Sequence, residues 1–383
     1  MKKIAHIVPW FYLGGIETHL YNLKMYINEY EHHIITDKGS VYREPYKHIE
    51  TMFVLIGPED TNRYKSLVNS RLRPFYMFSR IKNKLTYIKS NNYDLVHCHD
   101  IGINPVLRSR FFPKLLTKLI CDCWIENTRD IPTLFTDHSL FSRYLDSSEQ
   151  QSAQVYLKLF ENIICVEKSG YDNVLKWCKE HGVQKNVWYI PNSVDTRMFS
   201  YSEPQERDRL VVGYAARIGR EGQSLLEELI INLPEKVDVH IAFGGSETAI
   251  NEFRQKYGSE RVKIFANVPY EKMPEFYRGL DLFFNPIPLP GKGRNTLEAM
   301  SCGKPTIMSI DNDRHPIING KTGFLIEYEI NSLLELLQLI INDREKIYSI
   351  GRNARKIIED EYSNDVLIPR LKNVYEQIIN EKT

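Results

Sequence analysis

Short apolar runs rich in β-branched residues alternate with longer stretches of helical periodicity along the whole chain. Such runs are typical of buried strands in parallel sheets, and their alternation with helices predicts βαβ units. In the first half, strands are expected at 3–8, 33–36, 52–56, 94–98, 119–124, 162–166 and 187–190. Expected helices there include 16–29 and 167–181.

The pattern begins again after residues 200–208, a polar, charged stretch that contains Pro204 and is typical of a linker. Strands are then expected at 210–215, 237–243, 261–266, 281–285, 305–309 and 323–326. The expected helices are 222–233, 247–257, 271–279, 295–302, 330–357 in two pieces and 363–381. These elements predict an α/β protein of two doubly wound, Rossmann-like domains that face each other across a cleft. We place the domains at 1–200 and 209–362, followed by a C-terminal helix at 363–383.

The composition agrees with this architecture. The chain has 383 residues, of which 42% are hydrophobic and 26% charged, as in soluble globular proteins of two domains. No apolar run approaches the roughly 18 residues of a membrane-spanning helix. His6 and Pro9 interrupt the apolar start, so we interpret it as a buried strand and not as a signal peptide. The six cysteines are dispersed, which favours reduced thiols and a cytoplasmic location.

Charge is balanced over the chain but not between its halves. Residues 1–200 carry 26 basic and 21 acidic side chains, a net charge of +5, and the remaining residues carry 24 and 28, a net charge of −4. Residues 63–89 hold eight basic residues, no acidic ones and five aromatic ones. This mixture suits an anionic membrane surface, single-stranded nucleic acid, or a plain solvated helix face. We favour the membrane and expect no nucleic-acid partner.

Ligands of doubly wound sheets bind beyond the carboxyl ends of the strands, so the candidate chemistry lies in the loops there. After the first strand, Gly14 and Gly15 open a helix, where backbone amides can approach a phosphate closely. A purely structural turn is the alternative. The loop after the strand at 281–285 is a candidate pyrophosphate cradle. Its glycine and basic residues are Gly291, Lys292, Gly293 and Arg294.

Four further polar residues stand at strand ends or just beyond the cradle. Glu298 is a candidate ligand-binding carboxylate, but residues 295–298 also fit a capping box, in which the glutamate only satisfies a backbone amide. Arg217, with Arg220 nearby, is placed to hold a diphosphate. His138 is either a structural hydrogen-bonding group or one that orients a substrate. His97 and His99 form no recognised metal-binding spacing with the cysteines, so no metal is expected.

Taken in order, these loops resemble the family-4 retaining glycosyltransferases, which have the two-domain GT-B fold. The resemblance covers nearly the whole chain and rests on motifs at 14–17, 94–99, 190–195, Arg217, 277–283, 297–305 and 320–324. Within that family, residues 135–141 are similar to the matching segment of enzymes that add N-acetylglucosamine to phosphatidylinositol.

The resemblance implies transfer of a sugar from a nucleoside-diphosphate sugar, with a UDP-sugar favoured, to an acceptor hydroxyl with retention of anomeric configuration. The setting would be polysaccharide or glycolipid synthesis, without cofactor or metal ion, on a glycan, lipid-linked or protein acceptor. It assigns the acceptor to the N-terminal domain, the donor to the C-terminal domain, and places the C-terminal helix against the N-terminal domain. We therefore expect a cytoplasmic protein that is peripheral on the cytoplasmic face of a membrane.

By position, Glu298 would hold the donor ribose, His138 would lie near the reacting sugar, and Arg217 would stabilise the leaving diphosphate. These three are the catalytic residues that the resemblance implies. The donor-binding set is Gly14, Gly15, Arg217, Arg220, Gly291, Lys292, Gly293, Arg294, Asn295, Thr296, Leu297 and Glu298.

Two positions depart from the family pattern. Pro290 stands where the first of two glutamates is usual, and Glu221 stands near the place of a phosphate-binding lysine. These departures motivate a second hypothesis, a catalytically inactive GT-B partner subunit or glycan-binding protein. A third is a nucleotide-sugar epimerase on the same fold. A nicotinamide dehydrogenase is disfavoured because neither domain's first strand precedes a dinucleotide fingerprint.

Overall fold

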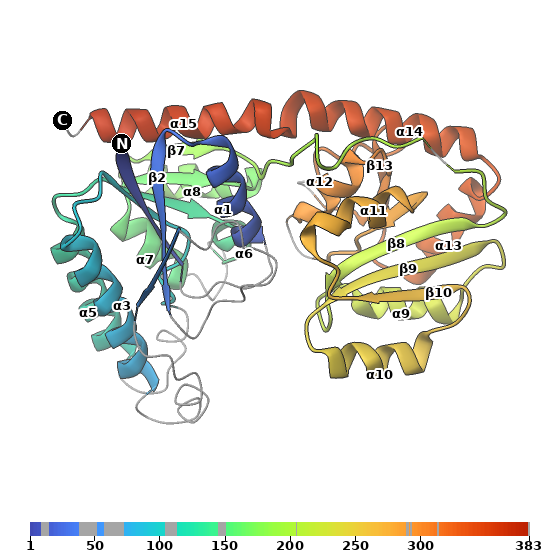
Figure 1. Cartoon of the computed structure of the whole chain (residues 1–383), viewed down its shortest axis with the longest axis horizontal. Helices are drawn as coiled ribbons and strands as arrows, with labels where there is room; N and C mark the ends of the chain where they lie inside the picture. The colour runs from blue at the N-terminus through green and yellow to red at the C-terminus, as the bar shows by residue number, and fades with distance from the viewer. Residues whose placement is uncertain are drawn as a thin grey trace. The chain divides into compact units, whose positions relative to one another are not determined.

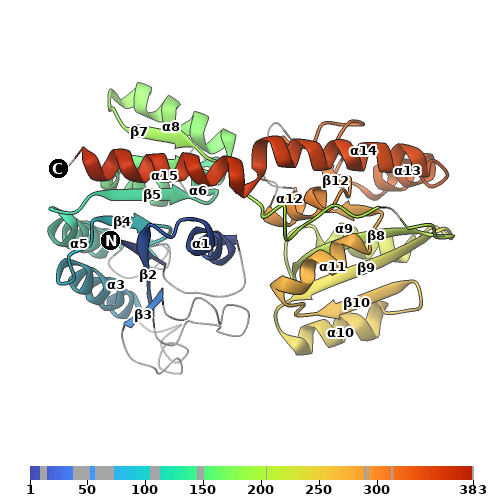
Figure 2. The same cartoon turned by 45° about the horizontal axis from the view of Figure 1, so that its top comes forward.

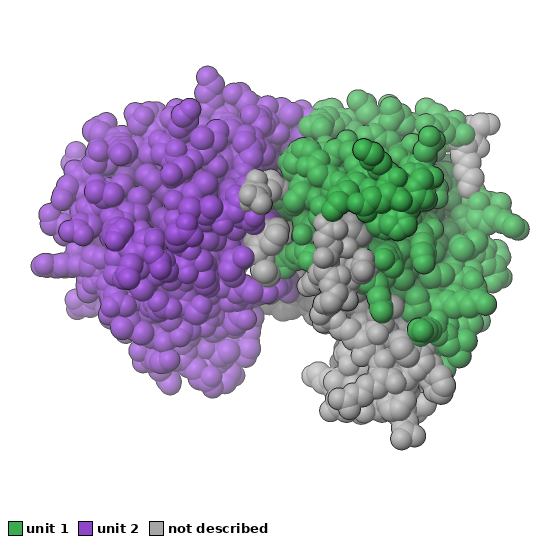
Figure 3. Space-filling view, turned by 180° about the vertical axis from the view of Figure 1, so that it is seen from behind, with its two compact units in different colours: residues 1–191, 368–383 green, residues 192–367 purple. Residues whose placement is uncertain are grey.

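The two halves of the chain form separate compact units. The computed structural model describes residues 1–8, 15–37, 52–56, 73–103, 113–144, 151–203, 205–288, 291, 293–311 and 314–381. One unit comprises residues 1–191 with 368–383, and the other comprises residues 192–367 (Figure 3). The last residues of the chain therefore belong to the same unit as the first.

A seven-stranded parallel sheet forms the centre of the first unit (Figure 1). In spatial order its strands are β3 (Phe53–Ile56), β2 (Tyr30–Asp37), β1 (Lys2–Ile7), β4 (Leu95–Cys98), β5 (Thr133–Asp137), β6 (Asn162–Cys165) and β7 (Asn186–Tyr189). The strand order reverses between β1 and β4. In such sheets this switch point is where ligands bind, beyond the carboxyl ends of the strands.

Helices cover both faces of this sheet. They are α1 (Gly15–Tyr26), α3 (Arg73–Lys89), α5 (Pro113–Thr128), α6 (Leu140–Tyr144), α7 (Gln151–Leu159), α8 (Lys168–His181) and most of α15 (Asn364–Asn380). One apolar layer joins Leu20 of α1 and Tyr375 of α15 to the sheet, and Figure 2 shows α15 running along the strands. The other layer contains Leu85 of α3 and Ile120 of α5. Burial on both faces explains the nearly continuous apolar runs of these strands.

The second unit repeats the plan with six parallel strands. In spatial order they are β10 (Val262–Ala266), β9 (Val237–Gly244), β8 (Leu210–Arg217), β11 (Leu282–Phe284), β12 (Thr306–Ser309) and β13 (Gly323–Ile326). The helices are α9 (Gln223–Ile231), α10 (Glu247–Tyr257), η3 (Tyr270–Lys272), α11 (Met273–Arg278), α12 (Arg294–Ser301), α13 (Ile330–Ile340), α14 (Arg344–Ile357) and η4 (Ile358–Tyr362). The switch point lies between β8 and β11, and apolar clusters again occupy both faces.

The predicted fold class is confirmed, since each unit is a Rossmann-like α/β domain. One predicted strand is wrong: residues 119–124 lie inside α5, and the next strand along the chain is β5. Leu116, Ile120 and Cys123 are buried at helical spacing. A short apolar run does not distinguish a buried strand from a buried helix, which explains the error.

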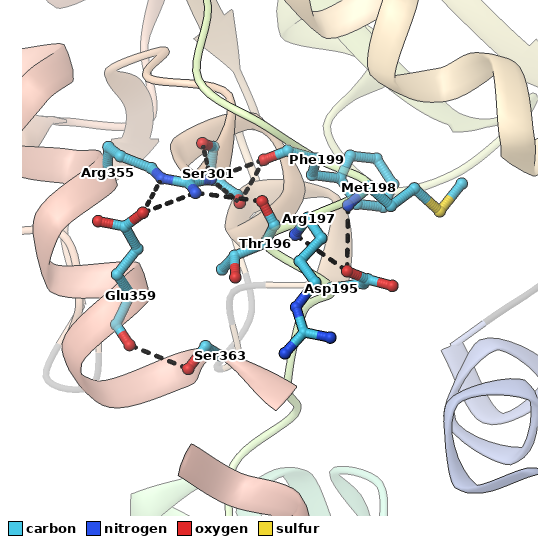
Figure 4. Close-up of polar contacts among 9 residues, drawn as sticks. All are labelled: Asp195, Thr196, Arg197, Met198, Phe199, Ser301, Arg355, Glu359 and Ser363. Carbon is cyan, nitrogen blue, oxygen red and sulfur yellow. Dashed lines mark hydrogen bonds and ion pairs between the residues drawn. The ribbon is translucent and has the colours of Figure 1, made fainter. Parts of the chain in front are cut away.

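The irregular segment that enters the second unit is fastened by one arginine (Figure 4). Arg355 of α14 donates hydrogen bonds to the carbonyl oxygens of Thr196 (3.1 Å), Phe199 (2.8 Å) and Ser301 (2.7 Å). Because residues 196–199 have no sheet partner, their carbonyl groups need such donors when they are buried. Arg355 thus holds the segment against α12, the helix that carries Glu298.

Candidate active site

The loop after β8 lies against the loop after β11 at the switch point of the second unit. Arg217 ends β8 with an exposed side chain. The chain then turns through Gly219 and Gly222, whose φ angles are 79° and 94°. A Cβ atom on Gly222 would lie 2.2 Å from the carbonyl oxygen of Pro286, so only glycine permits this approach. The close contact fixes the loop that presents Arg217.

Hydrogen bonds attach the start of α12 to the strand ends. The Asn285 amide donates to Thr296 Oγ1 at 2.7 Å, and the Asn295 amide donates to the carbonyl oxygen of Ala215 at 2.8 Å. Gly291 and Gly293 have φ angles of 105° and 71°, in the left-handed region. The cradle glycines therefore have the backbone conformation that favours glycine, which residues with a Cβ adopt only with strain.

Arg314 supports the cradle through its backbone. Its guanidinium is buried and donates to the carbonyl oxygens of Ile287 (2.8 Å), Ser309 (2.8 Å) and Gly291 (2.5 Å). A planar group with five donors suits several carbonyl groups at once. Sequence reasoning missed this residue because it stands well beyond the glycines that it holds.

Glu298 is buried on α12, and its Oε2 atom accepts a 2.9 Å hydrogen bond from the Tyr277 hydroxyl. The capping-box alternative is wrong, because α12 begins at Arg294 and its N-cap is Gly293. Burial raises the pKa of Glu298 to about 7, although Arg294 and the Tyr277 hydrogen bond act in the opposite direction. A carboxyl group of this kind can change its charge near neutral pH.

The two arginines of the predicted donor site near the glycines differ in environment. Arg294 is buried, and its guanidinium donates to the carbonyl oxygen of Ser193 (2.7 Å) and to Asn192 Oδ1 (3.1 Å). The structure thus gives Arg294 a packing role that the sequence did not indicate. Arg220 is exposed and lies 3.8 Å from the Glu221 carboxylate.

The remaining predicted residues fall into two groups. Gly15 is the first residue of α1, and the side chains of Thr296 and Leu297 are buried on α12. Gly14, Lys292 and Pro290 lie outside the described residues.

His138 follows β5 in the first unit, within a tightly bonded turn. The Asp137 carboxylate accepts hydrogen bonds from the backbone amides of Leu140 (2.6 Å) and Phe141 (3.3 Å), which fixes the start of α6. Burial raises the pKa of Asp137 to about 7, while these amide hydrogen bonds act in the opposite direction. Ser139 has a φ angle of 106°, a conformation that non-glycine residues adopt only with strain. The turn around His138 is therefore strongly determined.

Histidine side chains connect this turn to the middle of the sheet. His6 Nδ1 lies 3.2 Å from His99 Nε2, and His6 Nε2 lies 2.8 Å from His32 Nδ1. His99 Nδ1 lies 3.1 Å from His138 Nε2. His32 Nε2 donates to the carbonyl oxygen of Ile27 at 2.9 Å. We call these four residues, His32, His6, His99 and His138, the histidine row.

His97 lies beside the row. Its two ring nitrogens lie 2.7 Å from the Tyr375 hydroxyl and 2.6 Å from Thr136 Oγ1. One ring nitrogen each of His6, His97 and His99 lies within 4.8 Å of the others, a spacing that three ligands of one metal ion would have. The same nitrogens here make the hydrogen bonds just described.

Burial lowers the pKa of each histidine in the interior of this group. The pKa of His32 falls to about 4, and those of His6, His97 and His99 fall well below the ordinary value, in each case first through loss of hydration. These rings are neutral near pH 7. His97 and His99 are recognisable from the sequence as neighbours on one strand, but no sequence signal joins them to His6 and His32.

The basic segment at 63–89 is only partly at the surface. Arg80 and Lys84 lie on the inner side of α3, where their nitrogens approach Asp37 Oδ2 at 2.6 and 3.0 Å. The expectation that all eight cations face a membrane is therefore wrong for these two. Lys82 and Lys89 are exposed. Residues 63–72 lie outside the described residues.

Two Rossmann-like domains, each with polar groups gathered beyond its strand ends, define the GT-B class of protein. Two family models match this chain: Glycosyltransferase Family 4 over residues 13–197, and Glycosyl transferases group 1 over residues 194–357. The chain belongs to glycosyltransferase family 4.

Curated relatives are similar at low identity over most of the chain. An uncharacterized glycosyltransferase of Methanocaldococcus jannaschii is 22% identical over 99% of both chains. A human phosphatidylinositol N-acetylglucosaminyltransferase is 22% identical over 98% of this chain and 76% of that protein. The capsular polysaccharide biosynthesis glycosyltransferase CapM of Staphylococcus aureus is 24% identical, but the match spans only 56% of this chain and 57% of that protein.

Solved structures show the same fold. Sucrose-phosphate synthase from Thermosynechococcus elongatus matches over 100% of both chains with a TM-score of 0.74 and 17% identity. HepE from Anabaena, solved in complex with UDP-glucose, matches over 100% of this chain and 99% of its own with a TM-score of 0.68 and 17% identity. At this identity the likeness concerns the fold alone.

Proposed function

We propose that this chain transfers a sugar from a nucleoside-diphosphate sugar, with a UDP-sugar favoured, to an acceptor hydroxyl in polysaccharide or glycolipid synthesis. Anomeric configuration is retained, and no metal ion takes part. The main support is the pairing of exposed Arg217 with buried Glu298 at one switch point, the place where doubly wound sheets bind nucleotides. A relative whose name includes N-acetylglucosaminyl transfer to phosphatidylinositol, and a fold neighbour solved with UDP-glucose, support the substrate classes.

Each residue has a distinct part in this proposal. The Arg217 guanidinium binds the diphosphate with two parallel hydrogen bonds and stabilises the charge that develops as the sugar leaves. The Glu298 carboxylate accepts hydrogen bonds from the ribose hydroxyls. The turn at Gly291 and Gly293 brings backbone amides close to the phosphates. Positive charge and amides supplied by the protein take the place that a metal ion occupies in other transferases.

The first experiment is a thermal-shift screen of the full chain against UDP, GDP, ADP, dTDP and their sugar conjugates, with EDTA present. A ligand at one hundred times its dissociation constant stabilises a protein by about 2.7 kcal/mol. We expect one nucleotide to stand out, and Arg217→Ala to abolish its shift. Absence of any shift would instead favour an inactive partner subunit. Stabilisation that requires a divalent cation would contradict metal independence.

Product analysis then separates the two enzyme hypotheses. Incubation with the stabilising nucleotide-sugar should release the nucleoside diphosphate, by slow hydrolysis even without acceptor. A nucleotide-sugar epimerase would instead convert the donor to a new intact nucleotide-sugar. NMR of the recovered sugar product gives its anomeric configuration and so tests retention.

We further propose that the protein binds an anionic membrane peripherally through a surface on α3 and α5. Phe75, Leu115 and Leu119 expose 42%, 52% and 37% of their surface there, and Lys114 and Lys118 are exposed beside them. The two helices pack against each other, so these side chains share one region of the first unit. No helix among the described residues has both the length and the apolarity to cross a bilayer. Apolar side chains among lysines suit the headgroup region, where each lysine contributes about 1 kcal/mol.

Vesicle co-sedimentation tests this surface. Wild-type protein should sediment with phosphatidylserine-containing vesicles and not with pure phosphatidylcholine vesicles. The double variant Leu115→Asp/Leu119→Asp should remain in solution with both. Leu339 on α13, which is 77% exposed in the second unit, offers a matched control, and Leu339→Asp should sediment like wild type. Equal sedimentation of the double variant and wild type would exclude the surface.

A further inference from the structure

The histidine row has one fixed direction, and its first member sets it. The carbonyl oxygen of Ile27 can only accept a hydrogen bond, so His32 Nε2 carries a hydrogen. A neutral imidazole has one hydrogen, so His32 Nδ1 is an acceptor. His6 Nε2 must then be the donor in the 2.8 Å contact between these two rings. The hydrogen positions follow from the carbonyl group and from charge neutrality alone.

The same argument passes along the row. Since the hydrogen of His6 is on Nε2, its Nδ1 accepts the 3.2 Å bond from His99 Nε2. His99 Nδ1 accepts in turn the 3.1 Å bond from His138 Nε2. At the end of the row, His138 carries its hydrogen on Nε2, so Nδ1 of a neutral His138 ring has a lone pair.

The fold makes this row rigid. Its members come from β2, from β1, from the residue after β4 and from the residue after β5, so it crosses the switch point of the first sheet. His6, His32 and His99 are buried, and Tyr375 of α15 closes the same face through its contact with His97. Exchange of any one ring nitrogen for the other would break a buried hydrogen bond, which costs about 1–3 kcal/mol.

We propose that the Ile27 carbonyl, acting through His32, His6 and His99, fixes His138 as the neutral tautomer whose Nδ1 accepts a hydrogen bond from a substrate hydroxyl. His32, His6 and His99 are then positioning residues, and His138 is the member that meets substrate. This inference rests on the proposed glycosyl transfer. Positive charge develops at the anomeric carbon in such reactions, so a neutral acceptor suits the site better than an imidazolium ion does.

The hydrogen positions can be measured without any substrate. In protein labelled with 15N-histidine, long-range 1H–15N spectra separate protonated from unprotonated ring nitrogens, and His138→Gln assigns the His138 signals. We expect a single neutral species with the hydrogen on Nε2. A His138 ring with its hydrogen on Nδ1, or a mixture of the two tautomers in wild type, overturns the proposal. This readout stands even if the chain proves to transfer no sugar.

Three variants test the chain of positioning. His32→Leu removes the link to the carbonyl, and we expect both His138 tautomers to appear. His32→Gln retains it, because an amide can donate to Ile27 and accept from His6, so the single tautomer should persist. His33 is the matched control on the same strand, with contacts to Tyr93 and Glu31 outside the row, and His33→Leu should change nothing at His138. Circular dichroism confirms that each variant is folded.

Kinetics supply the second readout. His32→Leu should lower kcat by about tenfold or more while the KM for the donor stays within about twofold, because positioned proton-exchanging groups contribute about 10²–10⁴ to rate. His32→Gln should recover most of the loss. Loss of kcat with an unchanged His138 tautomer would overturn the proposal, as would stoichiometric zinc in the purified protein bound through His97 and His99. Inactive wild type with the expected tautomer would refute the glycosyl transfer and leave the hydrogen-bond assignment standing.

Discussion

The hydroxyl of Tyr277 donates a 2.9 Å hydrogen bond to Oε2 of Glu298, and both side chains are buried. Tyr277 belongs to α11 and Glu298 to α12, so the contact joins two helices on one face of the second sheet. This bond lowers the pKa of Glu298 and partly offsets the effect of burial. Tyr277 therefore helps to set the charge of the carboxylate proposed to bind the donor ribose.

Tyr277→Phe should raise the pKa of Glu298 further, by about one unit, because a hydrogen bond to a charged group contributes about 1.5–3 kcal/mol. Fewer molecules would then carry the ionised carboxylate at pH 7, and donor affinity should fall there but recover toward pH 9. Calorimetric titration of the donor nucleotide between pH 6 and 9 measures this shift. Tyr214, buried on β8 against Phe243, is the control, and Tyr214→Phe should leave the pH profile unchanged.

Stability should depend on the same carboxyl group. The folded-state pKa of Glu298, about 7, lies above the ordinary 4.5, so the folded state binds the proton more tightly. The resulting stabilisation is fully present below pH 4.5 and is lost as the pH rises through 7. Glu298→Gln should therefore be more stable than wild type at pH 8, by about 3 kcal/mol at most, and similar to it near pH 4.5. Urea unfolding at pH 4.5 and 8 tests this, and a stability difference independent of pH would argue against it.

The histidines give the first unit the opposite response. The pKa of folded His32 is about 4, and those of His6, His97 and His99 are also lowered, so the unfolded chain binds protons that the folded chain does not. Stability is fully present above pH 6.5 and is lost as the pH falls toward 4, by about 1 kcal/mol per ring for each pH unit. Asp137, with a folded pKa of about 7, opposes this by one proton only.

Urea unfolding at pH 7.5, 6.5 and 5.5 measures this slope. His97→Gln, which can still bond to Tyr375 and Thr136, should reduce it by about one proton. Retention of full stability at pH 5 would mean that the buried rings are charged in the folded protein.

The sequence was sufficient for the architecture because period and punctuation determine strands and helices locally. It located Glu298 through its motif, but not Tyr277, which stands 21 residues earlier and meets it only after two helices pack. The histidine row was beyond reach for the same reason. His32 and His6 lie on different strands, and their contact depends on the register that pairs Ile4 with His32 and His6 with Ile34.

Arg217 and Arg294 show where residue type alone was misleading. Both follow a strand near glycines, and both were assigned to the diphosphate. Burial separates them, since Arg294 faces Asn192 and Ser193 within its own unit whereas Arg217 is exposed.

Alanine substitution should separate these two arginines experimentally. Arg294→Ala leaves buried acceptors without their donor, so it should cost about 3 kcal/mol of folding free energy. Arg217→Ala should change stability by no more than about 0.5 kcal/mol and weaken donor binding by about ten- to a hundredfold. Urea unfolding and calorimetric titration give both quantities. If Arg217→Ala left donor affinity intact, the diphosphate site would have to lie elsewhere.

The last prediction concerns the loop that presents Arg217, where two glycines form a matched pair. Gly219 and Gly222 both have positive φ angles, but a Cβ at Gly219 would meet no atom within 4 Å, whereas one at Gly222 would lie 2.2 Å from the Pro286 carbonyl oxygen. Gly219→Ala should cost about 1 kcal/mol, the backbone strain alone. Gly222→Ala should cost about 2 kcal/mol more, because the loop must move away from the end of β11. That movement also displaces Arg217, so donor affinity should fall in Gly222→Ala and not in Gly219→Ala. Equal donor affinities in the two variants would show that the contact with Pro286 does not position the arginine.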